Sequence, residues 1–469
     1  MSMDNYHITH ALQQKITADQ AFHYRIVPVA QMDHGLVFKT DSDSLKDLLA
    51  ELQIVLDADV ILEKCEKEEL QRYLATNYRQ KKEGSNQQLH LTNDFLERIL
   101  WEAKNIGCSD IHFEPYEERC RVRFRLDGKL LEQFTIANAE YPTIINKIKI
   151  KANLDIAEKR LPQDGRISMG TKGTEFDIRV STLPTLHGEK LVLRILSKDS
   201  GNLSLEALGL NDLELARYRE GVRHPNGIVL ISGPTGSGKT TTLYATLKYL
   251  NNGKTNILTV EDPIEYTLEG INQVQLRENI GLDFASTLRT FLRQDPDIIM
   301  VGEIRDVKTA NMAIRAALTG HLVLSTIHTN SAWATVSRLI DMGVPPFLIA
   351  STLNLSVAQR LVRKLCQDCK SEVAVHPGIF PESFRPPKEL TRHFVPMGCN
   401  SCHFTGYTGR KAIYEIVPVT KELSVPIKEN HLEIDTYLHE KNIQTLRDNA
   451  LKMVQDGTTS IEEVYSLLT

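Results

Sequence analysis

With 469 residues, the chain is too long for one ordinary domain and has room for about three or four. Hydrophobic residues make up 41% and charged residues 25%, which excludes wholesale disorder and a fibrous repeat. The formal charge of -5 gives no overall attraction to nucleic acid, so nucleic acid binding is disfavoured from the start.

The beginning of the chain carries no recognisable signal for export or membrane insertion. Residues 1–10 lack a basic start followed by an apolar stretch, and no window approaches about eighteen uninterrupted apolar residues. We therefore expect neither a signal peptide nor a transmembrane helix. Four of the seven cysteines form two CxxC pairs, which favours metal binding in a reducing cytoplasm over disulfides.

The chain starts with a predicted small α/β domain over residues 1–80. Strand-like segments at 23–30 and 34–40 precede a helical stretch at 63–78. Residues 81–90 are polar, lack periodic apolar positions and have the composition of a linker. No chemistry is readable in this part of the chain.

Residues 91–200 predict a second, α+β domain, in which a helical pattern leads into several strand-like segments. Arginines alternate over positions 119–125, so in a strand they share one face. Arg166 and Arg179 lie near other strand segments of this domain. Such charges are either solvated or, in a hexameric ATPase, can complete a nucleotide site from a neighbouring domain.

Residues 201–365 have the pattern of a RecA-like α/β domain. Apolar strands alternate with helical stretches, which predicts a mostly parallel sheet covered by helices. The strand-like NGIVLIS at 226–232 is followed by a Gly-rich turn and the helix-forming TTTLYATLKYL. Strand, loop and helix thus come in the order that a nucleotide site requires.

The Gly-rich turn matches the phosphate-binding pattern GxxxxGK[ST] in full. Its backbone N–H groups can face phosphate oxygens, Lys239 adds a charge at the β and γ phosphates, and the Thr240 hydroxyl can bind Mg2+. The loop therefore predicts binding of ATP with Mg2+. Its candidate nucleotide-binding residues are Gly233, Pro234, Thr235, Gly236, Ser237, Gly238, Lys239, Thr240 and Thr241.

Phosphoryl transfer also needs carboxylates at the carboxyl ends of neighbouring strands. IIMVGE ends in Glu303, as a Walker B element would, while ILTVED ends in Glu261 and Asp262 with Glu265 shortly after. An isolated acidic residue is more often a solvated strand end. With a complete phosphate-binding loop upstream, Glu303 and Glu265 are the favoured catalytic candidates.

Two histidines, His321 and His328, flank the apolar segment LVLSTI. A histidine in this position is either a hydrogen-bonded structural residue or a group that senses the γ phosphate or couples neighbouring subunits. Their spacing in the sequence does not choose between these roles.

Four cysteines after the motor pattern predict a structural zinc element over residues 366–402. Two CxxC pairs, separated by 29 residues, can form two knuckles around a tetrahedral Zn2+ with no open catalytic position. The spacer is longer than in a standard zinc ribbon, so thiols without metal remain the alternative. The ligand set would be Cys366, Cys369, Cys399 and Cys402. Residues 403–469 are predicted to form a C-terminal helical region.

From about residue 94 to the C-terminus, the chain resembles the type II secretion and type IV pilus assembly ATPases. The motifs that carry the resemblance are SDIHFEP (109–115), LPQDGRIS (161–168), DIRVSTLPTLHGEKLVLRIL (177–196), GPTGSGKTTT (233–242), VEDPIEY (260–266), DPDIIMVGEIRD (295–306), TGHLVLSTIHTN (319–330), AQRLVRKLC (358–366) and GCNSCHFTGYTGRKAIYE (398–415).

The resemblance implies a PAS-like domain hinged to a RecA-like motor, assembled as a hexameric ring with ATP between the two. It implies that Glu265 is the general base, that Glu303 acts on Mg2+ and water, and that Arg166 and Arg179 are trans-acting fingers. His321 and His328 match the family's His box.

The resemblance also implies partners and a cellular place. Turnover would move the tail of an inner-membrane platform protein and drive pilins into a fibre, at the cytoplasmic face of the inner membrane without insertion into it. The short N-terminal domain could dock on a membrane-anchored partner. The tetracysteine element favours assembly over retraction. Type II secretion is the alternative; a nucleic acid motor and a non-catalytic scaffold are less favoured.

Overall fold

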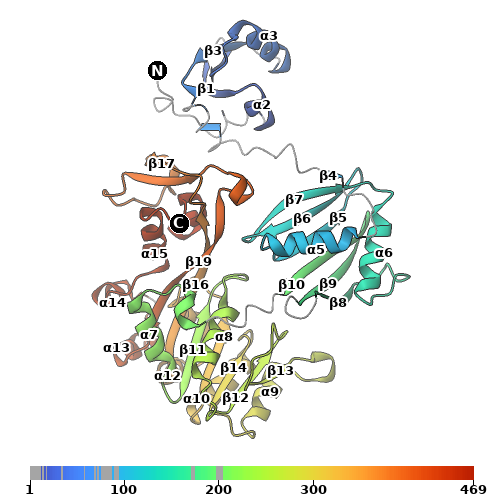
Figure 1. Ribbon diagram of the computed structural model, residues 1–469. Helices are drawn as coiled ribbons and strands as arrows, with labels where there is room; N and C mark the ends of the chain where they lie inside the picture. The colour runs from blue at the N-terminus through green and yellow to red at the C-terminus, as the bar shows by residue number, and fades with distance from the viewer. Residues whose placement is uncertain are drawn as a thin grey trace.

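The computed structural model describes residue 12 and residues 15–16, 18–32, 35–56, 59–67, 70, 73–74, 87–88, 94–170, 175–196, 204–431 and 433–469. Three sheets with separate cores organise these residues, and they follow one another along the chain (Figure 1). A further two-stranded sheet lies near the C-terminus. In the part of the chain that the structure describes, no helix has both the length and the apolar character needed to cross a bilayer.

Within its described residues, the N-terminal part contains a three-stranded sheet and the helices α2 and α3. Strands β1 and β2 are antiparallel, and β2 and β3 are parallel. The elements are α2 (Ala18–His23), β1 (Ile26–Met32), β2 (Gly35–Thr40), α3 (Leu45–Leu56) and β3 (Val60–Lys64). The helix predicted over 63–78 is wrong at its start, because Glu63 and Lys64 pair with β2. Much of its remainder lies outside the described residues.

The second sheet has seven strands in the order β4-β7-β6-β5-β10-β9-β8. Its elements are β4 (Gln87–Gln88), α5 (Phe95–Asn105), β5 (Asp110–Pro115), β6 (Cys120–Leu126), β7 (Lys129–Ile136), α6 (Tyr141–Lys151), β8 (Gln163–Met169), β9 (Phe176–Thr185) and β10 (Gly188–Leu196). We call it the mixed sheet. Two residues of the predicted linker therefore belong to β4, which pairs with β7.

One face of the mixed sheet is apolar and the other is charged. In β6, buried apolar residues alternate with half-buried arginines, as the sequence pattern predicts for a strand covered on one side. The apolar face packs with residues of α5 and α6 in one core. The arginines therefore point away from these helices.

The third sheet, the motor sheet, has seven strands in the order β13-β12-β14-β15-β11-β16-β19. All its neighbouring strands are parallel except β16 and β19. Its strands are β11 (Gly227–Ser232), β12 (Ile257–Glu261), β13 (Asn272–Gln275), β14 (Ile298–Val301), β15 (Leu322–Ile327), β16 (Leu353–Leu365) and β19 (Tyr407–Pro418).

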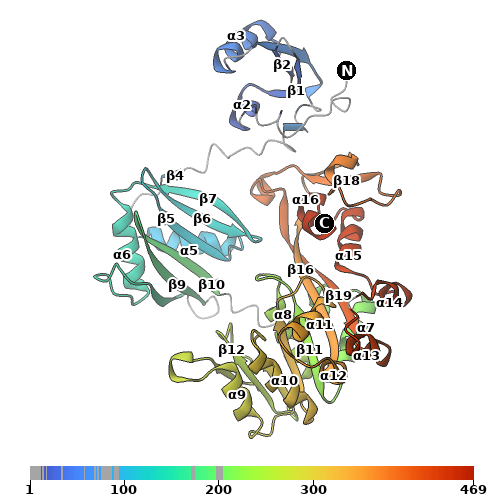
Figure 2. The same cartoon turned by 180° about the vertical axis from the view of Figure 1, so that it is seen from behind.

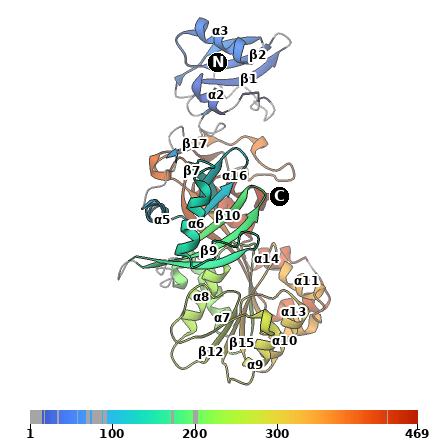
Figure 3. The same cartoon turned by 90° about the vertical axis from the view of Figure 1, so that its right-hand side faces the viewer.

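Helices cover both faces of the motor sheet (Figure 3). Alternate residues of β11 point into two different cores. Val229 and Ile231 belong to the core on one face of the sheet, and Ile228 and Leu230 belong to the core on the other face. This double burial explains the continuous apolar runs of the strands. The helices are α7 (Asp212–Val222), α8 (Lys239–Leu250), α9 (Phe284–Phe291), α10 (Val307–Leu318), α11 (Ala334–Asp341) and α12 (Pro346–Thr352), with short 3-10 turns at Leu205–Leu208 and Glu278–Ile280.

The C-terminal part continues the motor sheet. Strands β16 and β19 run side by side from the motor sheet to the two-stranded sheet of β17 and β18 (Figure 2). The remaining elements are β17 (Lys370–Ala374), β18 (Arg392–Pro396), α13 (Lys421–Lys428), α14 (Asp435–Glu440), α15 (Leu446–Gln455) and α16 (Ile461–Leu468), with 3-10 turns at Pro377–Ile379 and Asn400–Cys402.

The C-terminal helical region predicted over 403–469 contains helices from Lys421 onward but begins with a strand. Residues 407–418 form β19, whose second half is buried against β16 and the helices. A short apolar run of this kind is compatible with either a buried strand or a buried helix, so its periodicity does not distinguish the two structures.

Candidate active site

The phosphate-binding loop connects the buried strand β11 to the start of α8. Gly233 and Gly238 have φ angles of 149° and 89°, which side chains rarely adopt. A Cβ atom at Gly233 would also lie 2.5 Å from the carbonyl oxygen of Gln359, so the loop can pass β16 only with glycine there. The loop thus presents backbone N–H groups at a helix N-terminus, where anions bind.

Lys239, the first residue of α8, reaches back over this loop. Its Nζ donates to the carbonyl oxygens of Gly233, at 2.8 Å, and Pro234, at 3.1 Å. Burial lowers the pKa of Lys239, and the charge of Glu303 partly opposes this shift. Glu303 is therefore close enough to influence the ammonium, as a metal-linked carboxylate beside the loop should be.

Glu303 stands at the carboxyl edge of the motor sheet, just after β14. Its carboxylate pairs with Arg305 and lies 3.5 Å from Nε2 of His328. His328 directly follows β15, which pairs with both β14 and β11 in parallel. The strand register therefore brings Glu303, His328 and the phosphate-binding loop to one edge of the sheet.

The structure gives different surroundings to Glu261, the last residue of β12, and to Glu265, four positions later. Glu261 is 3% exposed and accepts hydrogen bonds from Tyr244, from Thr259 Oγ1 at 2.7 Å and from Gln273 Nε2 at 3.1 Å. Its bonding capacity is used inside the protein. The Glu265 side chain is 38% exposed and remains open to substrate and water.

Arg179 from the mixed sheet reaches this open glutamate. Its Nη2 donates to the carbonyl oxygen of Ile264 at 2.6 Å, and its Nη1 lies 3.4 Å from Oε2 of Glu265. Arg166 sits opposite Arg179 in the β8–β9 register but binds Asp177 instead, and its side chain is 65% exposed. Within one chain the structure thus brings Arg179, and not Arg166, to the motor sheet.

The two predicted histidines lie at opposite ends of β15. His328 joins the carboxyl edge, whereas His321 precedes the strand, next to the start of β11, where its backbone oxygen accepts from Gly227 N. A six-residue strand separates them by about 20 Å. His321 Nδ1 lies 2.9 Å from the carbonyl oxygen of Ala316, at the end of α10. The structure does not bring the two rings together.

Two side chains of β16 beside the phosphate-binding loop, Gln359 and Arg360, were not predicted from the sequence. Gln359 is buried and its Oε1 accepts from Thr242 Oγ1 in α8 at 2.8 Å. Arg360 donates to the carbonyl oxygens of Gln359 and Asn330, each at 3.0 Å. Both lie within the motif AQRLVRKLC, which was the available signal, but no spacing links that motif to the loop.

The four predicted cysteines form one compact cluster. Their ligand atoms all lie within 4.8 Å of one another, and the Sγ–Sγ distances are 3.8 Å for Cys366–Cys399 and Cys369–Cys402 and 3.7 Å for Cys399–Cys402. Four thiolates about 2.3 Å from a tetrahedral Zn2+ would be about 3.8 Å apart. The cluster therefore has the dimensions that zinc requires.

Comparison with known proteins agrees with this geometry. The family model described as "Type II/IV secretion system protein" matches residues 85–466. The chain belongs to this family. Type II secretion system protein E of Pseudomonas aeruginosa is 48% identical over 377 residues, which cover 79% of this chain and 74% of that relative. The type IV pilus assembly ATPase PilB of Myxococcus xanthus is 48% identical over 373 residues, 78% of this chain but just under two thirds (66%) of that relative.

Solved structures of other ATPases share the fold. The ATPase DotB of Legionella pneumophila is 23% identical with a TM-score of 0.61, and the alignment covers 81% of this chain and 96% of that one. The pilus retraction motor PilT with bound ADP is 26% identical with a TM-score of 0.53, covering 79% and 95%. The predicted family, the α/β fold with a RecA-like motor and the ATPase class are thereby confirmed.

The family implies ATP and Mg2+, and the phosphate-binding loop of this chain fits them. The buried Ser237 hydroxyl has no hydrogen-bond partner among the described residues, although it points into the loop close to Gly233. Buried hydroxyls are normally paired, so a ligand oxygen would complete it. The residues that would hold the nucleotide are those of the loop from Gly233 to Thr241, with the exposed Thr240 available to the metal.

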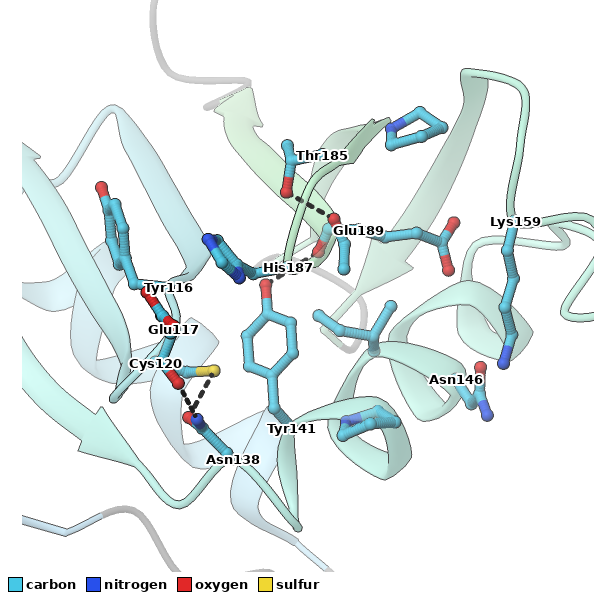
Figure 4. Close-up of a pocket in the computed structure, with 14 residues that line it drawn as sticks. Tyr116, Glu117, Cys120, Asn138, Tyr141, Asn146, Lys159, Thr185, His187 and Glu189 are labelled. Atoms are coloured by element: carbon cyan, nitrogen blue, oxygen red, sulfur yellow. Dashed lines mark hydrogen bonds between the residues drawn. The ribbon is translucent and has the colours of Figure 1, made fainter.

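A separate cavity of about 310 Å³ opens in the mixed sheet, between the start of α6 and the turns of β5–β6 and β9–β10 (Figure 4). All its lining residues fall between Tyr116 and Glu189, so it contains no part of the phosphate-binding loop. Tyr141 spans it and donates to the carbonyl oxygen of Glu189 at 2.8 Å. It is therefore distinct from the nucleotide site.

Proposed function

We propose that this protein couples ATP hydrolysis to assembly of a type IV pilus, as a homohexamer acting on an inner-membrane platform protein. The observation that carries the proposal is the contact of Arg179 with Glu265, because it links the mixed sheet to the active edge of the motor sheet. A change in nucleotide at that edge then alters the tie between the two sheets. Movement of one sheet against the other is the output that a mechanical ATPase needs.

The proposed chemistry assigns one role to each group at the carboxyl edge. Lys239 and the loop bind the phosphates, Thr240 and Glu303 hold Mg2+ and its water, and Glu265 accepts the proton of the attacking water. Arg179 from the same chain and Arg166 from a neighbouring subunit neutralise developing charge. His328 orients Glu303, while His321, at the other edge, couples the motor sheet to adjacent subunits.

The remaining elements are proposed to support assembly. Zn2+ in the cluster of Cys366, Cys369, Cys399 and Cys402 stabilises the C-terminal part. The N-terminal domain docks on a membrane-anchored partner, which places the enzyme at the cytoplasmic face of the inner membrane. Neither nucleic acid nor insertion into the bilayer is part of the proposal.

Type II secretion is the second candidate function. The secretion relatives match at the same identity, and the alignment covers 74% of Pseudomonas protein E against 66% of Myxococcus PilB. A shared motor with a different export machinery explains equal identities. The two functions therefore differ in the partners, which the motor residues do not specify.

Hydrolysis of ATP by the purified protein tests the proposal, with Lys239→Ala and Glu303→Gln as matched variants and mass measured by light scattering. We expect Mg2+-dependent turnover, lost by at least about 100-fold in both variants, and a hexamer stabilised by nucleotide. Nucleotide binding without turnover in the presence of platform protein would contradict an ATPase motor. Rescue of piliation, or of exoprotein secretion, in the corresponding deletion strains decides between the two systems.

A further inference from the structure

Arg360 occupies a position between two loops of the active edge. Ser232, the last residue of β11, pairs with Ala358, so the next residues of β16 run beside the phosphate-binding loop. Arg360 Nη1 would lie 3.2 Å from a Cβ atom at Gly233. Its Nη2 donates to the carbonyl oxygen of Asn330, two residues beyond His328. One guanidinium therefore lies beside the phosphate-binding loop and hydrogen-bonds to the loop after β15.

The charge of Arg360 is not neutralised by a carboxylate. Among the residues that the structure describes, it has only carbonyl acceptors, from Gln359 and Asn330. Arg363 in the same strand, by contrast, binds Glu463 through Nε and Nη2, at 3.0 and 2.6 Å. Buried charges are normally paired. A half-buried arginine held by carbonyl groups alone is thus available to an anion.

The neighbouring charges also favour an anion beside Arg360. Arg360 lies close enough to Lys239 to help lower the pKa of that lysine, after burial, while only Glu303 opposes the shift. Burial lowers the pKa of Arg360, and the charge of Glu415 opposes this shift; the Glu415 carboxylate, however, already accepts from Ala332 N at 2.7 Å and Leu446 N at 3.2 Å. The positive charges of Lys239 and Arg360 thus both act beside the phosphate-binding loop, and the neighbouring carboxylates do not fully neutralise them.

We propose that Arg360 binds the terminal phosphate of the nucleoside triphosphate and reports its presence to the loop that follows β15. The inference rests on the proposed ATP site. The guanidinium exchanges the carbonyl oxygen of Asn330 for a phosphate oxygen, a stronger, charge-assisted acceptor. The segment 328–331 loses this anchor when triphosphate binds and regains it with diphosphate. Because His328 contacts Glu303, the exchange links the nucleotide state to the catalytic edge.

Equilibrium binding of fluorescent mant-ATP and mant-ADP tests the inference without relying on turnover. We expect Arg360→Gln to weaken mant-ATP binding by about 10- to 100-fold and mant-ADP binding by less than about threefold, since a hydrogen bond to a charged group is lost only with triphosphate. Arg360→Lys should be intermediate. Arg392→Gln, in the two-stranded sheet and paired with Glu372, should change neither affinity.

Hydrogen exchange of residues 328–331 is the second readout. In the wild type, protection should differ between mant-ATP and mant-ADP complexes, and in Arg360→Gln this difference should vanish. Equal weakening of both nucleotides, or of neither, overturns the inference even if the wild type hydrolyses ATP. If Arg360→Gln selectively loses affinity for mant-ATP but the wild-type protein shows no turnover, the result supports the role of Arg360 and counts against the proposed motor. If Arg360→Gln unfolds like the wild type in the absence of nucleotide, misfolding is excluded as the cause of weaker binding.

Discussion

Nη1 of Arg179 lies 3.4 Å from Oε2 of Glu265; Arg179 belongs to the mixed sheet, and Glu265 lies in the loop between β12 and β13 of the motor sheet. The companion bond, from Arg179 Nη2 to the carbonyl oxygen of Ile264, fixes the backbone just before the glutamate. Glu265 therefore sits where its position depends on the placement of the mixed sheet. Under the proposed role of Glu265 as general base, this dependence would allow hydrolysis to respond to domain movement.

Replacing Glu265 with Gln should remove turnover while leaving the protein folded. The partly exposed carboxylate contributes little to stability, but loss of a general base typically lowers rates by about 100- to 10,000-fold. ATP hydrolysis and nucleotide binding, measured on the same preparation, should show the rate falling with binding retained.

Glu261→Gln is the matched control. This residue, four positions earlier, is buried and accepts from Tyr244, Thr259 and Gln273. We expect its substitution to lower the free energy of unfolding by about 1–3 kcal/mol, because a buried acceptor is replaced by a group that also brings donors. If Glu261→Gln instead abolished turnover with unchanged stability, the assignment of the base to Glu265 would be wrong.

A second contact between the mixed sheet and the motor sheet involves Asp127, at the tip of the β6–β7 hairpin. Its Oδ2 accepts from Gly409 N at 2.8 Å, and its Oδ1 lies 3.7 Å from Nε of Arg410, both in β19. Asp127→Gly keeps the positive φ angle of 46° accessible but removes the acceptor. We expect the Gly409 amide to exchange about tenfold faster, as measured by hydrogen exchange, with little change in global stability.

Asp127→Asn is the control for this tie, since its side-chain oxygen can still accept from Gly409 and asparagine tolerates the same backbone conformation. Protection at Gly409 should therefore remain near the wild-type value. Unchanged protection in Asp127→Gly as well would show that the hairpin does not hold β19 in solution.

The cysteine cluster predicts a bound metal that supports the small sheet of β17 and β18. An isolated pair of strands is marginally stable, and Cys366 and Cys369 precede β17 while Cys399 and Cys402 follow β18. We expect about one zinc ion per chain by elemental analysis. Cys399→Ser, or chelation, should remove the metal and lower the melting temperature.

Cys108→Ala provides the comparison for the cluster. Cys108 is buried in the mixed-sheet core, and burial raises the pKa of its thiol to about 12, as expected for an inert cysteine. Its substitution should leave the zinc content unchanged. A wild-type protein purified from zinc-containing medium with no metal and full stability would contradict the structural role.

The sequence was sufficient to predict the positions of candidate residues that belong to short contiguous motifs. The phosphate-binding loop is local, because strand, glycines, lysine and helix follow one another, and Glu303 could be located because parallel strands end at one edge. The cysteine pairs were equally readable. In each of these cases, the chemistry dictates a short pattern that periodicity and spacing can identify.

Relationships between distant segments could not be read in this way. Arg179 and Glu265 are 86 positions apart, and Gln359 lies 117 positions from its partner Thr242. Both contacts depend on how sheets and strands are placed, which no local pattern encodes. The strand register likewise places His321 and His328 at opposite edges of the motor sheet, which their spacing in the sequence does not indicate. The extension of the motor sheet by β19 could not be predicted either, because the apolar run of β19 is short enough for a strand or for a helix.

Glu114 of β5 predicts a pH dependence of stability. Its side chain is 4% exposed and accepts from Arg123 Nε at 2.8 Å and from Arg121 Nε at 3.0 Å, with Lys190 Nζ at 3.1 Å. Burial alone would raise its pKa, but these hydrogen bonds from Arg123, Lys190 and Arg121 outweigh burial and lower the pKa from 4.5 to about 2. The carboxylate thus unites three strands of the charged face.

The sign of the effect follows from the two protonation equilibria. The unfolded chain binds a proton at Glu114 near pH 4.5 and the folded chain only near about 2, so the ion cluster stabilises the fold above pH 4.5 and loses this contribution as the pH falls toward 2. The full contribution is about 3 kcal/mol. Urea unfolding between pH 7 and pH 3 should therefore show Glu114→Gln destabilised by about this amount at pH 7, with the difference from wild type shrinking below pH 4.5.

Glu132→Gln isolates the effect of burial in this cluster. Glu132 also faces arginines of the β6 region, at 3.3 Å from Arg119 and 3.7 Å from Arg121, but its side chain is 26% exposed. Exposed ion pairs contribute only about 0–1 kcal/mol, so its substitution should change unfolding little at any pH. If the two variants behaved alike at pH 7, solvent would screen Glu114 as well, and the charged face would be held by packing instead of by its buried carboxylate.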